Sequence, residues 1–324
     1  MATYKEIHGV KVQSLDADPT AVEGDVWYNA STSLLKMYTY AAGTWASGGN
    51  LNTGRMVGSS AKNAPATASL VTGGETSAPT SVAVTETYDG SSWTEVGDLN
   101  IARSEMAGAG TATAALSISG YTVSGDAYKD EVESWNGTSW TEIADVNTAR
   151  GEGAGCGTQT SAVFFSGQSP MKTNSEEWDG SSWAEGDDVN TARAYVGGCG
   201  VQTAALMFAG APAPNSQLTE SYNGTSWTEV GDLVADAYNT GDFGSETACV
   251  AAGGDPGKKV TVEEWNGTAW SEQNNISTGR NSMYASATGA TAGYITGGQL
   301  PSAGMSAATE EWTSALASQT IAFD

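Results

Sequence analysis

The chain has 324 residues, and its 37 acidic and 13 basic side chains give a formal net charge of −24. Most of such a surface repels nucleic acid and anionic membranes, so both are disfavoured as partners. Charged residues make up only 15% of the chain and glycine contributes 41 residues. This composition is typical of many short strands joined by tight turns, and it predicts no long helices.

The N-terminal segment, residues 1–44, lies outside the pattern that organises the rest of the chain. Its first residues are polar and lack the apolar region of a signal peptide, and no stretch of the chain reaches the roughly 18 consecutive apolar residues of a membrane span. Residues 18–38 read DPTAVEGDVWYNASTSLLKMY. They predict a β-hairpin with strands around Val26–Asn29 and Leu34–Tyr40 and a polar turn at Ala30–Ser33.

From residue 45 a motif recurs, as in YNGTSWTEVGD at 222–232. Its tryptophans are 43 to 48 residues apart, a period typical of β-propeller blades. An aromatic residue lies five residues before each of them, and Trp312 occupies that earlier position without a tryptophan after it. The repeated tryptophans are Trp45, Trp93, Trp140, Trp183, Trp227 and Trp270.

Arginine and glycine recur in the same register. Ten residues after the tryptophans stand Arg55, Arg103, Arg150, Arg193 and Arg280, with Ala237 as the exception. These five are all the arginines of the chain. Some 16 to 19 residues further on stands a glycine pair, or a small residue followed by glycine, at 73–74, 119–120, 166–167, 209–210, 253–254 and 297–298.

Each unit therefore predicts four strands. The first follows the arginine, the second is a short apolar run ending at the glycine, the third carries the earlier aromatic residue, and the fourth begins at the tryptophan. Asp-Gly and Asn-Gly between the third and fourth strands favour a tight hairpin turn. The tryptophan is then expected to pack between adjacent sheets.

The order of arginine, glycine pair, aromatic residue and tryptophan resembles the kelch repeat over residues 45–312. The resemblance implies an all-β, six-bladed kelch-like β-propeller, which we place at residues 45–316 after the N-terminal β-hairpin segment of residues 1–44. The last unit lacks its own fourth strand. We expect the Trp45 strand to complete it, with the C-terminal residues 317–324 as a tail or as the competing closing strand.

The repeat leaves few residues for catalysis. The Asp-Gly pairs are adjacent, unlike those of a sialidase Asp-box, and no arginine remains to bind a substrate carboxylate. With His8 as the only histidine, copper-oxidase and serine-hydrolase chemistry are disfavoured, and we expect no metal, no cofactor and no enzymatic activity. A calcium loop and a pair of catalytic carboxylates remain open. A glutamate repeated two residues before each third-strand aromatic is interpreted as scaffold: Glu86, Glu133, Glu176, Glu220, Glu263 and Glu310.

The three cysteines are predicted to be unpaired. Cys156 and Cys199 fill a small-residue position in neighbouring repeats, where the two side chains are expected to lie too far apart for a disulfide. Cys249 is interpreted in the same way.

The repeats differ most in the loops between second and third strands and in the fifth unit, where VADAYNTGDFG replaces the arginine region. Loops of this kind carry recognition in many folds, although free drift of surface loops gives the same pattern. Our candidate binding residues are Tyr121, Lys129, Lys172, Asp236, Tyr238, Asp242, Lys258 and Lys259.

The GD-aromatic hairpin of residues 18–38 resembles a segment of tail-fibre-like proteins of tailed bacteriophages, and the whole chain resembles kelch-like structural proteins of marine bacteriophages. The resemblance implies a virion protein assembled in the bacterial cytoplasm, attached to other virion proteins through residues 1–44 and compatible with a homo-oligomer. Its propeller loops would bind a host-surface polysaccharide or protein. The alternatives are a purely structural capsid-decoration or tail subunit, and a glycan hydrolase with an Asp/Glu pair on the channel rim.

Overall fold

The computed structural model describes residues 12–22, 24–77, 80–168, 170–302 and 304–321. The chain divides into two compact units, one formed by Met1–Thr44 with Thr313–Asp324 and the other by Trp45–Trp312. Within the described residues the secondary structure is β-strand apart from two short 3-10 turns, η1 (Val123–Gly125) and η2 (Asn215–Gln217). None of the described residues forms a helix long and apolar enough to span a membrane.

The smaller unit is one four-stranded sheet in the order β1-β2-β3-β30. Its strands are β1 (Gln13–Leu15), β2 (Val26–Asn29), β3 (Leu34–Tyr40) and β30 (Leu316–Thr320). The antiparallel pair β2 and β3 confirms the predicted hairpin. Trp27 stacks on Tyr38 with ring centroids 4.6 Å apart, and Lys36 pairs with Asp18 at 2.9 Å.

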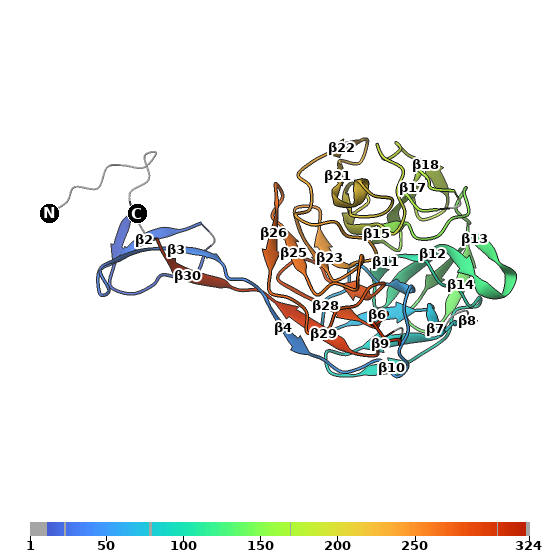
Figure 1. The fold of residues 1–324 in the computed structure, drawn as a ribbon, viewed down its shortest axis with the longest axis horizontal. Coiled ribbons are helices and arrows are strands. Elements are labelled where there is room, and N and C mark those ends of the chain that lie inside the picture. The colour runs from blue at the N-terminus through green and yellow to red at the C-terminus, as the bar shows by residue number, and fades with distance from the viewer. Residues whose placement is uncertain (1–11, 23, 78–79, 169, 303, 322–324) are drawn as a thin grey trace. The chain divides into compact units, whose positions relative to one another are not determined.

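The larger unit contains six four-stranded sheets (Figure 1). Their first strands are β5 (Ser59–Ser60), β11 (Ala107–Thr111), β15 (Ala154–Thr158), β19 (Gly197–Val201), β23 (Gly241–Ser245) and β27 (Tyr284–Ser286). Their second strands are β6 (Ser69–Thr72), β12 (Ala114–Thr122), β16 (Ser161–Phe165), β20 (Ala204–Phe208), β24 (Ala248–Ala252) and β28 (Ala292–Thr296). We number the sheets one to six in this order.

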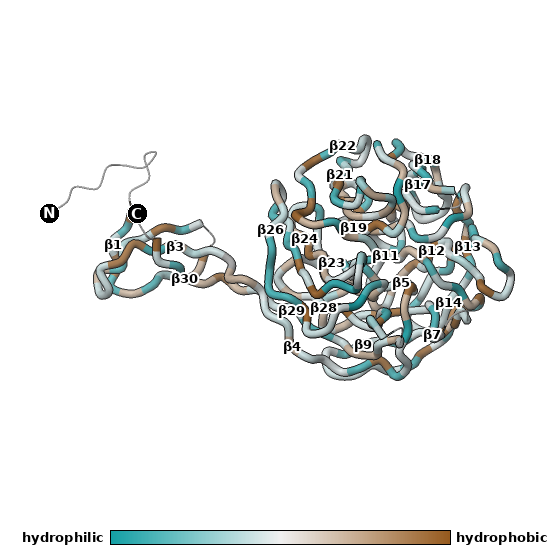
Figure 2. The backbone as a smooth tube through the Cα atoms, viewed as in Figure 1, coloured by the Kyte–Doolittle hydropathy of each residue, from teal (hydrophilic) through white to brown (hydrophobic). Residues whose placement is uncertain are grey.

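The third and fourth strands of each sheet carry the repeated aromatic residues. The third strands are β9 (Thr85–Tyr88), β13 (Ala127–Trp135), β17 (Ser175–Trp178), β21 (Thr219–Tyr222), β25 (Val262–Trp265) and β29 (Thr309–Thr313). The fourth are β10 (Trp93–Glu95), β14 (Trp140–Ile143), β18 (Trp183–Glu185), β22 (Trp227–Glu229), β26 (Trp270–Gln273) and β4 (Thr44–Ser47). In Figure 2 the outer strand β26 is mostly hydrophilic, as expected of a strand that faces water. A small hairpin of β7 (Glu75–Ser77) and β8 (Thr80–Ser81) extends the first sheet's loop.

The chain ends decide how the sixth sheet is completed. Strand β4, which carries Trp45, lies beside β29, so the expected contribution of the N-terminal strand is confirmed. The competing expectation, that the C-terminal residues form the closing strand, is wrong for residues 317–320, because β30 pairs with β3 in the smaller unit. Residues 322–324 lie outside the described residues, and Thr313 to Leu316 lie outside the larger unit in which we had placed them. Strand β30 pairs with β3 over five consecutive residue pairs, from Lys36–Thr320 to Tyr40–Leu316. This pairing provides hydrogen-bond partners for the backbone of β30 in the smaller unit.

The repeated tryptophans pack between neighbouring sheets, as predicted. Trp140 of the second sheet is 5% exposed, shares a core cluster with Leu70 of the first sheet, and donates its indole N–H to Thr85 Oγ1 at 3.0 Å. Trp270 makes the same bond to Thr219 Oγ1 of the fourth sheet. Burial of these large rings, at about 25 cal/mol for each Å² removed from water, is the main force that holds sheet to sheet.

The first strands contact one another in sequence. β5 contacts β11, and the series continues through β15, β19, β23 and β27, from which the contact returns to β5. Contacts between first strands therefore run from each sheet of the larger unit to the next and return from the sixth sheet to the first.

Candidate functional site

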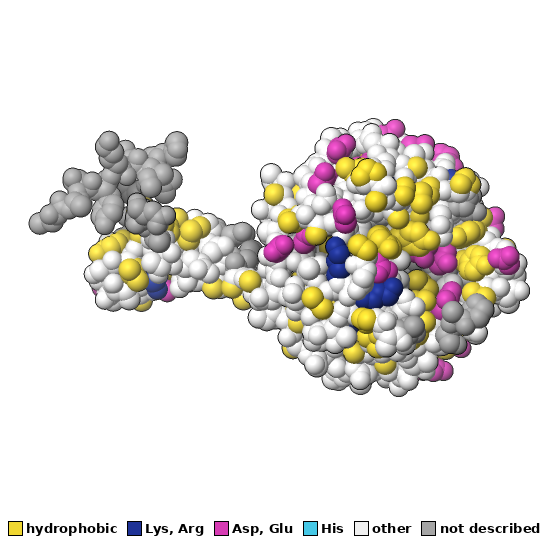
Figure 3. All heavy atoms as spheres, viewed as in Figure 1, with side chains coloured by type: hydrophobic (Ala, Val, Ile, Leu, Met, Phe, Trp, Pro, Cys, Tyr) yellow, Lys and Arg dark blue, Asp and Glu magenta, His cyan; other side chains and the backbone are white. Residues whose placement is uncertain are grey.

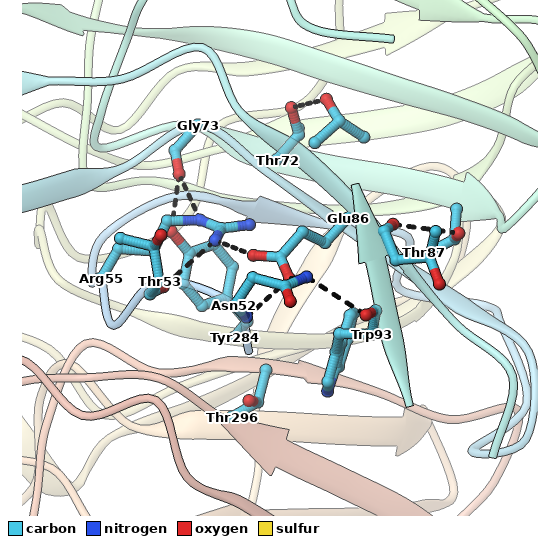
Figure 4. Close-up of polar contacts among 12 residues, drawn as sticks. Asn52, Thr53, Arg55, Thr72, Gly73, Glu86, Thr87, Trp93, Tyr284 and Thr296 are labelled. Carbon is cyan, nitrogen blue, oxygen red and sulfur yellow. Dashed lines mark hydrogen bonds and ion pairs between the residues drawn. The ribbon is translucent and has the colours of Figure 1, made fainter. Parts of the chain in front are cut away.

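The five arginines are buried within the sheets, where each pairs with a repeated glutamate. Arg55 is fully buried, pairs with Glu86 on the third strand and donates from Nε to Gly73 O at 3.2 Å (Figure 4). The second carboxylate oxygen of Glu86 accepts from the backbone N–H of Asn52 at 2.9 Å. The same pair recurs as Arg103–Glu133, Arg150–Glu176, Arg193–Glu220 and Arg280–Glu310.

In the fifth sheet Ala237 takes the place of the arginine, so the repeated glutamate, Glu263, has no arginine partner in the part of the chain that the structure describes. Glu263 is 6% exposed and accepts backbone N–H groups of Val234 and Ala235, but no cation among the described residues pairs with it. Burial raises the pKa of Glu263. Beside it a small cavity of about 10 Å³ is lined by Ala237, Gly253 and Thr261. The arginine–glutamate pairs thus belong to the scaffold, and the fifth sheet lacks one partner.

A closed cycle of backbone hydrogen bonds joins the six sheets. Its members lie two residues after the arginine position and all have positive φ: Val57, Glu105, Glu152, Tyr195, Asn239 and Ser282. Each donates its N–H to the carbonyl of the member in the preceding sheet, with N···O distances of 2.5 to 3.1 Å, and Val57 closes the cycle by donating to Ser282 O at 3.1 Å. We call these residues the ring.

A second set of positions surrounds the ring. The residue before each ring member forms a β-bridge with the residue that follows the glycine pair, as in Ser104 with Tyr121 and Gly151 with Gln168. The bridge repeats in every sheet, whereas the side chains at the outer position differ: Glu75, Tyr121, Gln168, Ala211, Asp255 and Gln299. We call the ring together with these outer residues the mouth. It combines a uniform backbone with varied side chains.

Carboxylates and tyrosines gather on one side of the mouth. Gln168 Nε2 donates to the Tyr195 hydroxyl at 3.0 Å, and Tyr195 lies 6.2 Å from Tyr238 between ring centroids. Gly151 leaves room for this group, because a Cβ there would lie 2.8 Å from both Glu105 Oε2 and Tyr128 Cε1. Glu105 and Tyr128 therefore approach each other over a residue that must be glycine.

The mouth opens into a central cavity of about 80 Å³ lined by the first strands and by ring residues. Lys62 and Asp242 also line it, and Lys62 Nζ lies 2.7 Å from Asp242 Oδ2. Because these residues come from the first and fifth sheets, the ion pair crosses the interior rather than joining neighbours. Figure 3 shows hydrophobic, acidic and basic side chains near the middle of one face of the larger unit.

The predicted binding residues include tyrosines at or next to the mouth and lysines that bond to other parts of the chain. Tyr121 belongs to the mouth and donates to Asp126 Oδ1 at 2.5 Å, and Tyr238 lies next to the mouth, where it forms a β-bridge with Asp255. Lys129 pairs with Glu131, Lys258 with Asp255, and Lys259 donates to the backbone carbonyl of Asp236. Lys172 is half-buried, and its backbone N–H bonds to Gly167 O.

Asp242, a third candidate binding residue of the fifth unit beside Asp236 and Tyr238, lines the central cavity. Asp242 lies on β23, is 5% exposed, and accepts from Lys62 and from the Gly198 N–H at 3.0 Å. It faces the cavity because it follows the ring residue Asn239 into the first strand, whereas Tyr238 precedes Asn239 and stays at the surface.

The cysteine prediction is corrected in part. Cys199 and Cys249 form a disulfide, with Cα atoms 6.4 Å apart. Cys156 is free and buried. The expectation failed because Cys249 lies on a second strand, β24 of the fifth sheet, and not on a first strand. There it lies against Cys199 on β19, the first strand of the fourth sheet. Comparing only equivalent first-strand positions does not reveal this contact.

The described residues contain no group of three or more histidine, cysteine or acidic side chains placed to hold a metal ion. Comparison with protein-family models finds no match. Comparison with curated proteins also finds none. The chemistry of the mouth therefore has to be argued from its own side chains.

Sequence reasoning missed Glu105, Glu152 and Tyr195. The signal that could have identified them is the variation at one repeat position. Two residues after the arginine position, the repeats carry valine, glutamate, glutamate, tyrosine, asparagine and serine in turn. Burial first, and the charge of Glu75 second, raise the pKa of Glu105 to about 7, partly opposed by the polar groups of Tyr128 and Gln168. Burial and the charge of Glu105 raise the pKa of Glu152 as well.

These shifts predict a pH-dependent stability. Between pH 4.5 and about 7 the folded protein retains the Glu105 proton that the unfolded chain has released. The free energy of unfolding should therefore fall as the pH rises through this range, by up to about 3 kcal/mol. Urea unfolding at several pH values should show that Glu105→Gln removes this part of the decrease. An unchanged slope in the variant would contradict the assignment to Glu105.

Proposed function

We propose that the larger unit is a six-bladed β-propeller of the kelch type. Three observations support this: six four-stranded sheets in sequence, contacts between first strands that return from β27 to β5, and a backbone hydrogen-bond ring with one member per sheet. Left-handed backbone at both residues of every glycine-pair position, including Ser119, Ser166 and Ala209, supports one common blade geometry.

We further propose that the protein is a non-enzymatic virion component of a tailed bacteriophage that binds a host-surface glycan through the mouth. The observation that carries the binding role is the mouth itself, where six equivalent backbone positions present unlike side chains, among them half-buried tyrosines. Tyrosine offers an apolar face for a sugar ring and a hydroxyl for hydrogen bonding. The five arginines are each paired with a repeated glutamate inside the sheets, so they are not available to this surface.

In this proposal the smaller unit attaches the protein to other virion proteins, and synthesis takes place in the host cytoplasm. The acidic composition supports a role that avoids nucleic acid and membranes. Many copies on one particle would strengthen weak individual contacts.

A glycan hydrolase is a second candidate, because Glu105 and Glu152 place two half-buried carboxyl groups of raised pKa at adjacent ring positions. Such a pair is a common source of acid and base in glycoside hydrolysis. The cavity between them opposes this function, because about 80 Å³ is well below the several hundred Å³ of a typical small-molecule pocket. Release of reducing sugar from host envelope polysaccharide would favour the hydrolase.

The binding proposal is tested with the full chain on an array of bacterial surface glycans. We expect specific binding that Tyr195→Ala weakens at least tenfold, since an aromatic anchor at the centre of an interface typically carries about 1–2 kcal/mol or more. Thr225→Ala, in an exposed hairpin turn between third and fourth strands, should leave binding unchanged. Absence of binding, together with a mouth covered by neighbouring subunits in an intact particle, would instead support a purely structural subunit.

A further inference from the structure

Two carboxyl groups of the mouth lack a counter-ion. Glu105 and Glu152 are consecutive ring members, joined by a backbone hydrogen bond of 3.1 Å, and both line the central cavity. Among the residues that the structure describes, neither forms an ion pair; the nearby lysines Lys62, Lys129 and Lys258 are paired with Asp242, Glu131 and Asp255. Burial without a counter-ion favours the neutral form of both carboxyl groups, in keeping with their raised pKa values, and a cation arriving from outside would favour the charged form.

Aromatic and polar groups complete the surroundings of this pair. Tyr128 and Tyr195 are half-buried beside the two carboxyl groups. Burial first, and the charges of Glu105 and Glu152 after it, raise the pKa of both tyrosines. The Tyr195 hydroxyl accepts from Gln168, which leaves its own O–H free to donate. Aromatic faces next to carboxylates are a combination that favours organic cations.

Two buried polar atoms at the cavity have no hydrogen-bond partner. Oε2 of Glu105 is one, and Oγ1 of Thr240 is the other. Thr240 is 8% exposed and lines the same cavity as Glu105 and Glu152, although it comes from the fifth sheet. Both atoms border the same cavity, so a polar ligand group placed there would supply the partners that they lack.

The size of the cavity limits what that group is. One water-sized probe sphere occupies about 10–15 Å³, so about 80 Å³ accepts an ammonium head with its first carbons but not a buried sugar ring. A metal ion fits the site less well, because the described residues offer no cluster of three acidic, histidine or cysteine ligands.

We propose that Glu105 and Glu152, with Tyr128, Tyr195 and Thr240, form a binding site for a primary ammonium group that enters the central cavity from the mouth. The inference rests on the proposed binding function and specifies its ligand: an amine-bearing molecule, with the ammonium group in the cavity and its carrier against the tyrosines. The ammonium donates to the two carboxylates and replaces the missing counter-ion. An amino sugar of a host glycan and a lysine side chain of a host protein both present this group.

The test uses pairs of probes that differ in the amine. Isothermal titration of the full chain at pH 7 compares pentylamine with pentanol, and glucosamine with N-acetylglucosamine. We expect binding of an amine and none of its neutral counterpart. Preference for glucosamine identifies a sugar carrier, and equal or better binding of pentylamine identifies an alkylamine such as lysine. Equal binding of charged and neutral probes, or no binding of either amine, would overturn the proposal.

Matched variants separate this site from the general attraction of cations to an acidic protein. Glu105→Gln and Glu152→Gln should each weaken amine binding by about 30-fold or more, because each removes one of two buried charge partners. Glu95→Gln removes the same charge from exposed strand β10 and should have little effect. Equal losses in all three variants would contradict the site. Amine binding without any bound glycan on the array would leave the site standing and refute the proposed glycan receptor alone.

Discussion

Replacing Arg150 by methionine should lower the free energy of unfolding by about 3–5 kcal/mol. Arg150 is fully buried, its Nη1 lies 2.5 Å from Glu176 Oε1, and its other donors bond to Ser166 O at 2.9 Å and Phe164 O at 3.1 Å. The guanidinium also lies 3.9 Å from the centroid of the Phe164 ring. Methionine fills part of the volume but leaves Glu176 Oε1 and three carbonyl oxygens, those of Thr148, Phe164 and Ser166, without the arginine donors. Guanidinium chloride unfolding at pH 7 measures the change.

Two further variants test this explanation. Arg150→Met combined with Glu176→Leu should recover most of the lost stability, because removing both charges leaves no unpaired buried group. Ala237→Arg supplies the missing partner of Glu263 in the fifth sheet, where Gly253 O and Thr261 O occupy the positions that bind arginine elsewhere. It should raise stability by roughly 1 kcal/mol. A loss below about 0.5 kcal/mol for Arg150→Met, typical of surface substitutions, would show that the pair is not structural.

Loss of the disulfide is the second large effect. Cys199 and Cys249 are separated by 50 residues, and a loop of that size gives about 4 kcal/mol of cross-link stabilisation by the chain-entropy estimate. Under oxidising conditions Cys199→Ala should therefore lower the free energy of unfolding by about 2–4 kcal/mol, since measured values often fall below that estimate.

The reducing condition supplies the control for this prediction. With the disulfide reduced in both proteins, the difference between wild type and Cys199→Ala should shrink to about 1 kcal/mol, the cost of a small change in a buried side chain. Cys156→Ala, which alters a free and buried thiol, should give a similar small loss under both conditions. If the difference in free energy of unfolding between wild type and Cys199→Ala were the same with and without reductant, the assignment of the disulfide would be contradicted.

Much of the fold is predictable because its signals are local. The Asp89-Gly90 turn is an example: Asp89 Oδ1 accepts from the N–H groups of Ser91 and Ser92 at 2.8 Å, and Gly90 has a φ of +89°. These preferences act within four residues, so the repeat predicts the hairpin directly. The position of Trp93 at the start of the fourth strand, and its packing toward the neighbouring sheet, follow from the same register.

Features that depend on contacts between sheets were not accessible in this way. The pairing of Cys199 with Cys249, the ion pair of Lys62 with Asp242, and the strand pairing of β30 each join residues distant in sequence. The mouth lies between these cases. The repeat predicts which residues occupy the ring positions. It does not predict that ring residues of neighbouring sheets lie side by side, and the differences between their side chains can be interpreted only once that is known.

Native-state hydrogen exchange of the six ring amides tests the central claim most directly. These amides lie in connecting segments, and a chain of separate sheets would leave them exposed to water. If the ring is closed, the N–H groups of Val57, Glu105, Glu152, Tyr195, Asn239 and Ser282 should be protected as strongly as those of the first strands, because each bonds to the preceding sheet. Fast exchange at Val57, whose bond to Ser282 O closes the ring, would contradict it.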